Sequence, residues 1–282
     1  MAPEDSGLIL IATAPDRPGL TAAIAGAVSA TGGNILDFEQ HVDPYELIYG
    51  CRVVIDGREL FDRLETAMNE LQLAHEVSWQ LHRSTERPRI VIACSSTLHC
   101  VGDLLVRSLS DDLPCEVVGV VSDKDAAASL ARRMDVPFVH VPVGEMREAQ
   151  EEAFGAALEL LQPDVVVLAR YMRILPAWLA EQWEHRMINI HHSTLPAFPG
   201  ANPRRRAHER GVKIIGATAH YVTAGLDEGP IIAQDAVPVA NDTLEALVQR
   251  GEDVERTVLA RAVRLHLEHR ILVFGNRTCV LG

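Results

Sequence analysis

Apolar and polar positions in the first 83 residues follow two alternating spacings. Residues 8–12 form a short apolar run that predicts a strand, and Leu20, Ile24 and Val28 then recur at the spacing of a helix. The alternation continues through an extended stretch at 35–42, an apolar stretch at 47–55, helical spacing from 60 to 71 and an alternating stretch at 77–81. The order strand, helix, strand, strand, helix, strand is typical of a ferredoxin-like (βαββαβ) sandwich.

The pattern changes after residues 84–88, a polar stretch ending in proline that is predicted to be a linker. Beyond it, short and almost wholly apolar runs alternate with stretches of helical spacing, as in sheets whose strands are buried on both faces. The strands are expected at 90–93, 117–121 and 165–168, and the helices near 103–109, 124–134 and 145–161. The chain is therefore predicted to contain one domain at 1–83 and a doubly wound, mostly parallel α/β domain at 89–282.

Composition and charge narrow the classes of protein that fit this pattern. The formal net charge is −13, which is the wrong sign for a general nucleic-acid binder. No apolar run reaches the roughly 20 residues of a membrane helix, and the acidic N-terminus resembles no targeting segment. The five cysteines are scattered, as expected of reduced thiols. We expect a cytoplasmic protein that binds neither membranes nor nucleic acid.

Polar side chains gather where one predicted strand ends. Asn189 and His191 lie two residues apart in an extended segment, so both point to the same side. Asp227 lies downstream in a loop at 225–230 that glycine and proline stiffen. An amide that donates to an oxyanion, an imidazole and a carboxylate together suit carbonyl chemistry. The plainer alternative is a turn-capping asparagine, satisfied histidines and an ordinary turn aspartate.

Histidine and cysteine residues also allow a metal site and a reactive thiol to be considered. His99, His191, His192 and Asp227 could form a metal site, but the chain has neither an H-E-x-x-H motif nor paired cysteines, so no metal is predicted. Cys100 precedes an apolar helix and is predicted to be a buried structural thiol.

Basic side chains supply a further set of candidates. Residues 204–206 are three consecutive arginines, which form either a solvated helix start or a clamp for an anionic ligand. Arg170 and Arg173 follow a buried strand and are also candidates for ligand binding.

Several motifs in one order resemble the formyltetrahydrofolate deformylase family. Segments 189–193 and 195–198 resemble its catalytic segment, 216–222 and 226–232 its second signature, 171–175 its folate-side loop, and 275–278 its terminal strand. The first part of the chain is similar to an ACT domain. The resemblance implies hydrolysis of 10-formyltetrahydrofolate to formate and tetrahydrofolate, which supplies formate for purine synthesis and balances one-carbon pools.

The resemblance also implies roles for particular residues. Catalysis would fall to Asn189, His191 and Asp227, with no tightly bound cofactor and with the folate as substrate. The implied substrate-binding residues are Tyr171, Met172, Arg173, Ile174, Leu175, His99, His192 and Gly200.

Two loops bear on which molecule accepts the formyl group. Glycinamide ribonucleotide formyltransferases have a glycine-rich phosphate loop after the first strand of this domain, where this chain has 94–100 without glycine, and this favours water. Ser96 stands where the family usually has lysine, and 204–206 replace an aromatic-His-Gln run. A transferase acting on an amine, and a non-catalytic folate or amino-acid sensor, are the alternatives.

The ACT-like part implies regulation by a small molecule. Its amino-acid-binding loops would be formed by Asp16, Arg17, Pro18, Gly19, Gly33 and Asn34. The resemblance implies glycine or methionine as the effector, and pairing between subunits implies a homo-oligomer. Tyr49–Arg52 depart from the usual Phe-Phe-Met-Arg, so a dimerisation module without a ligand remains the alternative.

Overall fold

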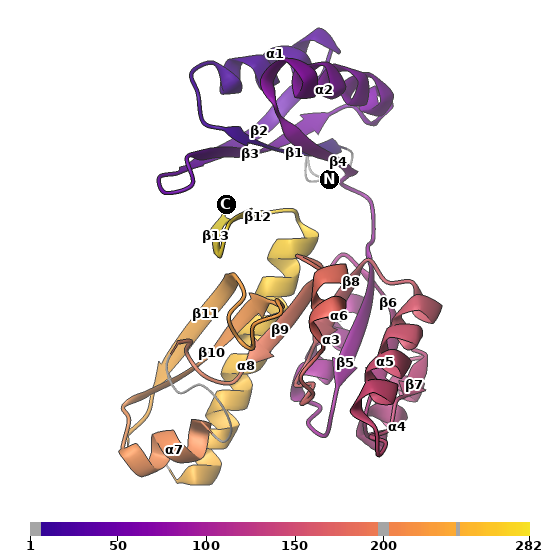
Figure 1. Ribbon diagram of the computed structural model, residues 1–282, viewed down its shortest axis with the longest axis vertical. Coiled ribbons are helices and arrows are strands. Elements are labelled where there is room, and N and C mark those ends of the chain that lie inside the picture. The colour runs from indigo at the N-terminus through magenta and orange to yellow at the C-terminus, as the bar shows by residue number, and fades with distance from the viewer. Residues whose placement is uncertain (1–6, 197–202, 241–242) are drawn as a thin grey trace. The chain divides into compact units, whose positions relative to one another are not determined.

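The computed structural model describes residues 7–196, 203–240 and 243–282 (Figure 1). The chain divides into two compact units. The first unit comprises residues 1–86 together with 268–282, and the second comprises residues 87–267. Among the described residues, no helix has both the length and the apolar content needed to cross a membrane.

The first unit has the predicted βαββαβ order, so the ferredoxin-like sandwich is confirmed. Its four-stranded antiparallel sheet has the order β2-β3-β1-β4. Leu8 and Leu10 on β1 pack with Leu20 and Ile24 on α1, because strand period two and helix period 3.6 each give one apolar face. The elements are β1 (Gly7–Pro15), α1 (Leu20–Ala30), β2 (Asn34–Asp43), β3 (Ile48–Asp56), α2 (Phe61–His75) and β4 (Ser78–Arg83).

A C-terminal hairpin of β12 (Ile271–Phe274) and β13 (Arg277–Val280) belongs to the first unit. Its Leu272 and Phe274 pack with Ile11 and Ile48, which alternate with the residues that face the helices. Residues 268–282 were predicted to lie in the second domain, whereas the structure groups them with the first. The reason is that the second face of the small sheet is also apolar and the hairpin covers it.

Gly50 on β3 makes room for this hairpin. A Cβ atom at Gly50 would lie 2.7 Å from Leu272 Cδ1 and 3.0 Å from Phe274 Cζ. Gly50→Val is therefore expected to destabilise the first unit by about 1–3 kcal/mol, the usual cost of overpacking, measured by urea unfolding. Gly26→Ala is the control, because a Cβ atom there meets nothing within 4 Å. Equal unfolding midpoints for wild type and Gly50→Val would contradict the packing.

The second unit is a seven-stranded, mostly parallel sheet with helices, as predicted. Its strand order is β11-β10-β9-β8-β5-β6-β7, and only the pairings of β10 with β9 and β11 are antiparallel. The strands are β5 (Arg89–Cys94), β6 (Glu116–Ser122), β7 (Phe138–His140), β8 (Val165–Leu168), β9 (Met187–His191), β10 (Ile214–Tyr221) and β11 (Ile231–Pro238). The helices are α3 (His99–Leu109), α4 (Ala128–Arg133), α5 (Arg147–Leu161), α6 (Ala177–Gln182), α7 (Pro203–Arg210) and α8 (Leu244–Leu267).

The strand order sets where a ligand can approach. β5 has β6 on one side and β8 on the other, so the chain direction across the sheet reverses at β5. Open α/β sheets bind ligands at the carboxyl ends of the strands beside such a switch point. The residues that follow β5, β8 and β9 are therefore the first place to examine for a site.

The cysteines are free thiols, and four of the five are buried. Burial raises the pKa of Cys94 to about 11 and raises that of Cys100 as well. A thiol with a raised pKa is a poor nucleophile at neutral pH, which supports the structural role predicted for Cys100.

Candidate active site

The polar residues of β9 and β10 form cross-strand pairs. Asn189 lies opposite His220, and His191 lies opposite Thr218, so the four side chains share one face of the sheet. Asn189 Nδ2 donates a hydrogen bond to His220 Nε2 at 3.1 Å. His220 and Thr218 are almost fully buried. Neither residue was predicted from the sequence, because only the β9–β10 register brings them to the site.

Asp227 completes the cluster from the loop after β10. Its Oδ2 lies 3.1 Å from His191 Nδ1, and its Oδ1 lies 3.6 Å from His220 Nε2. The loop is held close to the strand, since a Cβ atom at Gly229 would lie 1.8 Å from the carbonyl oxygen of Tyr221. The structure therefore brings together the three residues that the sequence pattern selected.

Hydrogen bonding fixes the tautomer of His220. Its Nδ1 lies 2.8 Å from the carbonyl oxygen of Tyr221, which can only accept, so Nδ1 carries a hydrogen. Nε2 of the neutral ring then accepts from Asn189. The Asn189 amide has two N–H groups and uses one of them here, so the second N–H is available for a substrate oxygen.

Asp227 is held in its charged form. Burial alone would raise the pKa of this carboxyl group, but the hydrogen bond with His191 and the nearby imidazole of His220 lower the pKa well below its usual range. The charged carboxylate is therefore present throughout the neutral and mildly acidic range. A charged Asp227 can accept a hydrogen bond from His191 and can accept a proton from water.

This pKa shift predicts a pH dependence of stability. A lowered pKa in the folded state stabilises the fold above the unfolded pKa of about 3.9, and the contribution is lost as pH falls below that value. The difference in Tm between wild type and Asp227→Asn is therefore expected to be largest near neutral pH and to shrink below about pH 4. Asp235→Asn, at an exposed position on β11, is the control. A difference independent of pH would contradict the paired carboxylate.

A buried network positions the segment that follows β9. His191 Nε2 is hydrogen-bonded to Ser193 Oγ at 2.9 Å. Thr218 Oγ1 donates to the Ser193 carbonyl at 2.8 Å and accepts from Leu195 N at 3.0 Å. Gln234 Nε2 donates to the Leu195 carbonyl at 2.9 Å. The network fixes Nε2 of His191 relative to the sheet, while Nδ1 faces Asp227.

The predicted folate-side loop after β8 divides into buried and exposed residues. Tyr171 is buried and stacks on Phe154, with ring centroids 4.9 Å apart. Met172 and Ile174 are 58% and 55% exposed, which leaves them open to a ligand. Leu175 is partly buried against the core. The loop thus presents alternate apolar side chains to solvent while its other residues anchor it.

Polar contacts fix this loop at the switch point. Met172 N donates to Ser95 Oγ at 3.0 Å. Arg173 Nε donates to Asp123 Oδ2 at 2.8 Å. Asp123 is buried, and its Oδ1 makes no hydrogen bond within the described residues. Asp123 was absent from the sequence-based site, although a polar residue directly after a buried strand was a usable signal.

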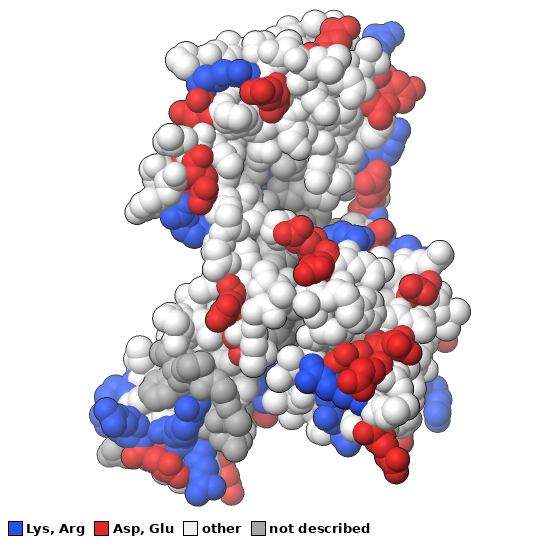
Figure 2. All heavy atoms as spheres, in the orientation of Figure 1, with Lys and Arg blue, Asp and Glu red and all other residues white. Residues whose placement is uncertain are grey.

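The remaining predicted substrate residues have different surroundings. His99 lies in a separate cluster, where its Nε2 is 2.8 Å from Glu255 Oε2. His192 lies beside His191, with ring centroids 5.2 Å apart. Gly200 lies outside the described residues. Arg205 Nε on α7 is exposed and lies 2.9 Å from Glu209 Oε1, which favours a solvated position for this arginine. Figure 2 shows basic side chains gathered over α7.

One group of three metal-ligand side chains lies close together within the described residues. His99, Cys100 and Glu255 have donor atoms within 4.8 Å of one another. Arg170 Nε lies 3.6 Å from the same Glu255 oxygen, so a metal cation there would have to compete with a guanidinium. This group differs from the metal alternative weighed from the sequence, which combined His99 with His191, His192 and Asp227.

The predicted effector loops lie at opposite ends of α1. Asp16, Arg17, Pro18 and Gly19 precede the helix, and Gly33 and Asn34 follow it. An 11-residue helix is about 16 Å long, so the two loops do not meet within one chain. Arg17 Nε makes no hydrogen bond within the described residues.

Segment 49–52, which departs from the usual family sequence, includes a tyrosine whose hydroxyl group is hydrogen-bonded. Tyr49 OH donates to Gln40 Oε1 at 3.1 Å, and Thr21 Oγ1 donates to the same oxygen at 2.6 Å. Tyr49 is buried. The tyrosine that replaces the usual phenylalanine therefore has its hydroxyl group satisfied inside the domain.

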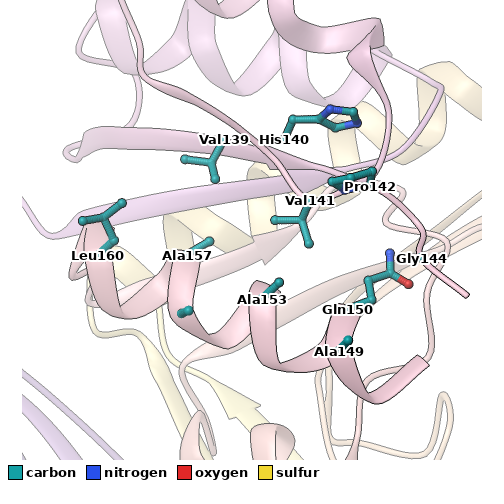
Figure 3. A pocket seen from close by; sticks show the side chains of 11 residues that line it. Val139, His140, Val141, Pro142, Gly144, Ala149, Gln150, Ala153, Ala157 and Leu160 are labelled. Atoms are coloured by element: carbon teal, nitrogen blue, oxygen red, sulfur yellow. The ribbon is translucent and has the colours of Figure 1, made fainter. Parts of the chain in front are cut away.

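A hollow of about 430 Å³ lies elsewhere in the second unit, between β7 and α5 (Figure 3). Its lining is mostly apolar and includes Val139, Val141, Ala153 and Leu160. None of Asn189, His191 and Asp227 lines it. Its lining offers little for chemistry on a carbonyl group.

Comparisons with known proteins agree with both halves of the chain. A family model described as formyl transferase matches residues 88–263, and one described as ACT domain matches residues 7–82. The formyltetrahydrofolate deformylase of Synechocystis sp. is 46% identical, with 97% of this chain and 98% of that protein covered. The deformylase of Bacillus subtilis is 41% identical, with 99% of this chain and 95% of that protein covered.

Solved structures extend the comparison to a second activity. A formyltetrahydrofolate deformylase from Pseudomonas syringae pv. tomato has a TM-score of 0.95 at 39% identity and covers 98% of this chain and 94% of its own. Glycinamide ribonucleotide transformylase 1 from Symbiobacterium toebii has a TM-score of 0.66 at 36% identity, and the match covers 70% of this chain and 95% of that chain.

Proposed function

This chain belongs to the formyltetrahydrofolate deformylase family, and from that premise we propose that it hydrolyses 10-formyltetrahydrofolate to formate and tetrahydrofolate. The observation that carries the proposal is the Asn189–His220–Asp227–His191 cluster at the carboxyl end of β9. It combines an amide donor, a charged carboxylate and imidazole groups on one face of the sheet. Groups of these kinds catalyse the attack of water on a formyl carbon.

In the proposed mechanism the formyl oxygen accepts a hydrogen bond from the second Asn189 N–H. Asp227 orients a water molecule and accepts its proton as the water oxygen bonds to the formyl carbon. Protonated His191, hydrogen-bonded to Asp227, stabilises the oxyanion. The C–N bond then breaks, the departing nitrogen takes up the proton, and formate leaves. Ser193 already positions His191 for these steps, and His220 positions Asn189.

Folate binding is proposed along the loop after β8. Met172 and Ile174 offer exposed apolar contacts for the ring system, while Arg173 and His192 offer polar ones. Tyr171 and Leu175 would act by holding the loop in place. Gly200 keeps its proposed role from the family resemblance. The folate enters as a substrate rather than as a resident cofactor.

The first unit is proposed to sense a small amino acid, glycine or methionine. Because its two loops lie at opposite ends of α1, one chain alone does not assemble them into a single site. A site shared between subunits would combine them, which is consistent with a homo-oligomer. We propose a cytoplasmic enzyme whose formate supports purine synthesis and whose activity balances one-carbon pools.

Incubation with 10-formyltetrahydrofolate in the absence of any amine tests the proposed function. We expect formate and tetrahydrofolate to appear in equal amounts. Tetrahydrofolate that forms only when an amine is added would instead identify a transferase. Folate binding without turnover under either condition would favour a sensor.

A further inference from the structure

The switch point of the second unit is filled by charged side chains of the chain itself. Arg170 follows β8, His99 begins α3 after β5, and Glu255 projects from α8. Leu168 on β8 lies opposite Asn189 on β9, so Arg170 and His191 emerge from neighbouring strands at the same edge of the sheet. A crevice that holds a ligand in other open α/β sheets here holds an ion cluster.

The cluster is buried and internally paired. Glu255 is 1% exposed, and its Oε2 accepts a hydrogen bond from His99 Nε2 at 2.8 Å. Arg170 Nε lies 3.6 Å from the same oxygen and makes no hydrogen bond within the described residues. The side chains of His99 and Arg170 are 9% and 14% exposed. Even a paired buried charge adds little net stability, because the cost of desolvation offsets the attraction, so this arrangement points to a role beyond stability.

The backbone at Arg170 supports the same conclusion. Its φ is +65°, a conformation that glycine adopts without strain and that other residues rarely adopt. This position holds an arginine where glycine would fit more easily. The conformation of the turn gives no reason for an arginine here, so the reason must lie in the contacts of its side chain.

The loop after β5 lacks the glycines of a phosphate-binding loop. No glycine occurs from Cys94 to Val101, although close approach of a phosphate to backbone N–H groups usually depends on glycine. The similar solved structure from Symbiobacterium toebii is named for an acceptor that is a ribonucleotide. In this chain the same edge of the sheet is occupied by Arg170, His99 and Glu255, which contact one another.

Building on the proposed function, we propose that Arg170, His99 and Glu255 occupy the acceptor subsite and thereby restrict the formyl acceptor to water. An amine acceptor would form a new C–N bond as the bond to the folate nitrogen breaks. With the subsite filled, no amine can approach the formyl carbon beside Asn189 and His191. Water is small enough to do so, and its oxygen forms the new bond instead.

Two variants test this proposal. Arg170→Gly removes the guanidinium group at a position whose backbone suits glycine. The double variant Arg170→Gly/Glu255→Gln also removes the charge of Glu255, which would otherwise be left buried without Arg170 beside it. Gln162→Gly is the matched control, because Gln162 also has a positive φ of 47° but caps α5 away from the cluster. Each protein is incubated with 10-formyltetrahydrofolate and glycinamide, a small primary amine, and formate, N-formylglycinamide and tetrahydrofolate are measured.

We expect wild type and Gln162→Gly to release formate only. In at least one of the two cluster variants, the ratio of formylated amine to formate should rise at least about tenfold, the lower end of what a change in one pocket contact produces. Formate alone from both variants would overturn the proposal. Loss of all turnover in both folded variants would also overturn it, because Arg170 would then serve the chemistry itself. Absence of formate from the wild type would contradict the proposed hydrolysis, so the two failures are distinguishable.

Discussion

Replacing Asp227 by asparagine is expected to lower the turnover of 10-formyltetrahydrofolate by about 10²–10⁴-fold, the range typical of a lost general base. The amide cannot accept a proton from water, and it places no negative charge beside His191. Folate binding should change little, because Asp227 lies at the reacting end of the proposed site. Steady-state kinetics on the purified variant measures both quantities.

Glu228→Gln provides the matched control for this change. Glu228 is the next residue of the same loop and is exposed to solvent. Its turnover should stay within a few-fold of the wild-type value. If Asp227→Asn retained nearly full activity, the carboxylate would have no catalytic role, and the proposed mechanism would fail.

Removing the amide of Asn189 is expected to give the second largest effect. Asn189→Ala should lower kcat by about 10²–10³-fold, the usual cost of one oxyanion donor. KM should change little, because the hydrogen bond strengthens as charge develops on the formyl oxygen. Asn276→Ala, in the exposed turn of the C-terminal hairpin, is the control. A rise in KM with kcat unchanged would instead place Asn189 in ground-state binding.

Local pattern was enough to predict the parts of the site that depend on local geometry. Asn189 and His191 share a face because of the two-residue period of a strand, and this period can be read directly from the sequence. Almost wholly apolar runs such as residues 165–168 likewise predicted strands buried on both sides. Asp227 was selected because it lies in a loop stiffened by glycine and proline.

The contacts that depend on strand register and helix packing could not be predicted in this way. His220 reaches Asn189 only because β9 and β10 are antiparallel neighbours in one register. Glu255 looks like one more charge on a long helix until α8 packs against the switch point. The C-terminal hairpin carries no signal in its own sequence for the sheet it covers. In each case the information lies in a partner distant along the chain.

A crystal structure of Asp227→Asn with 10-formyltetrahydrofolate bound tests the central claim most directly. The account predicts that the formyl oxygen lies about 2.7–3.1 Å from Asn189 Nδ2, the distance expected of an oxyanion donor, with the formyl carbon facing residue 227 and His191. A folate bound with its formyl group elsewhere, such as in the hollow between β7 and α5, would contradict it.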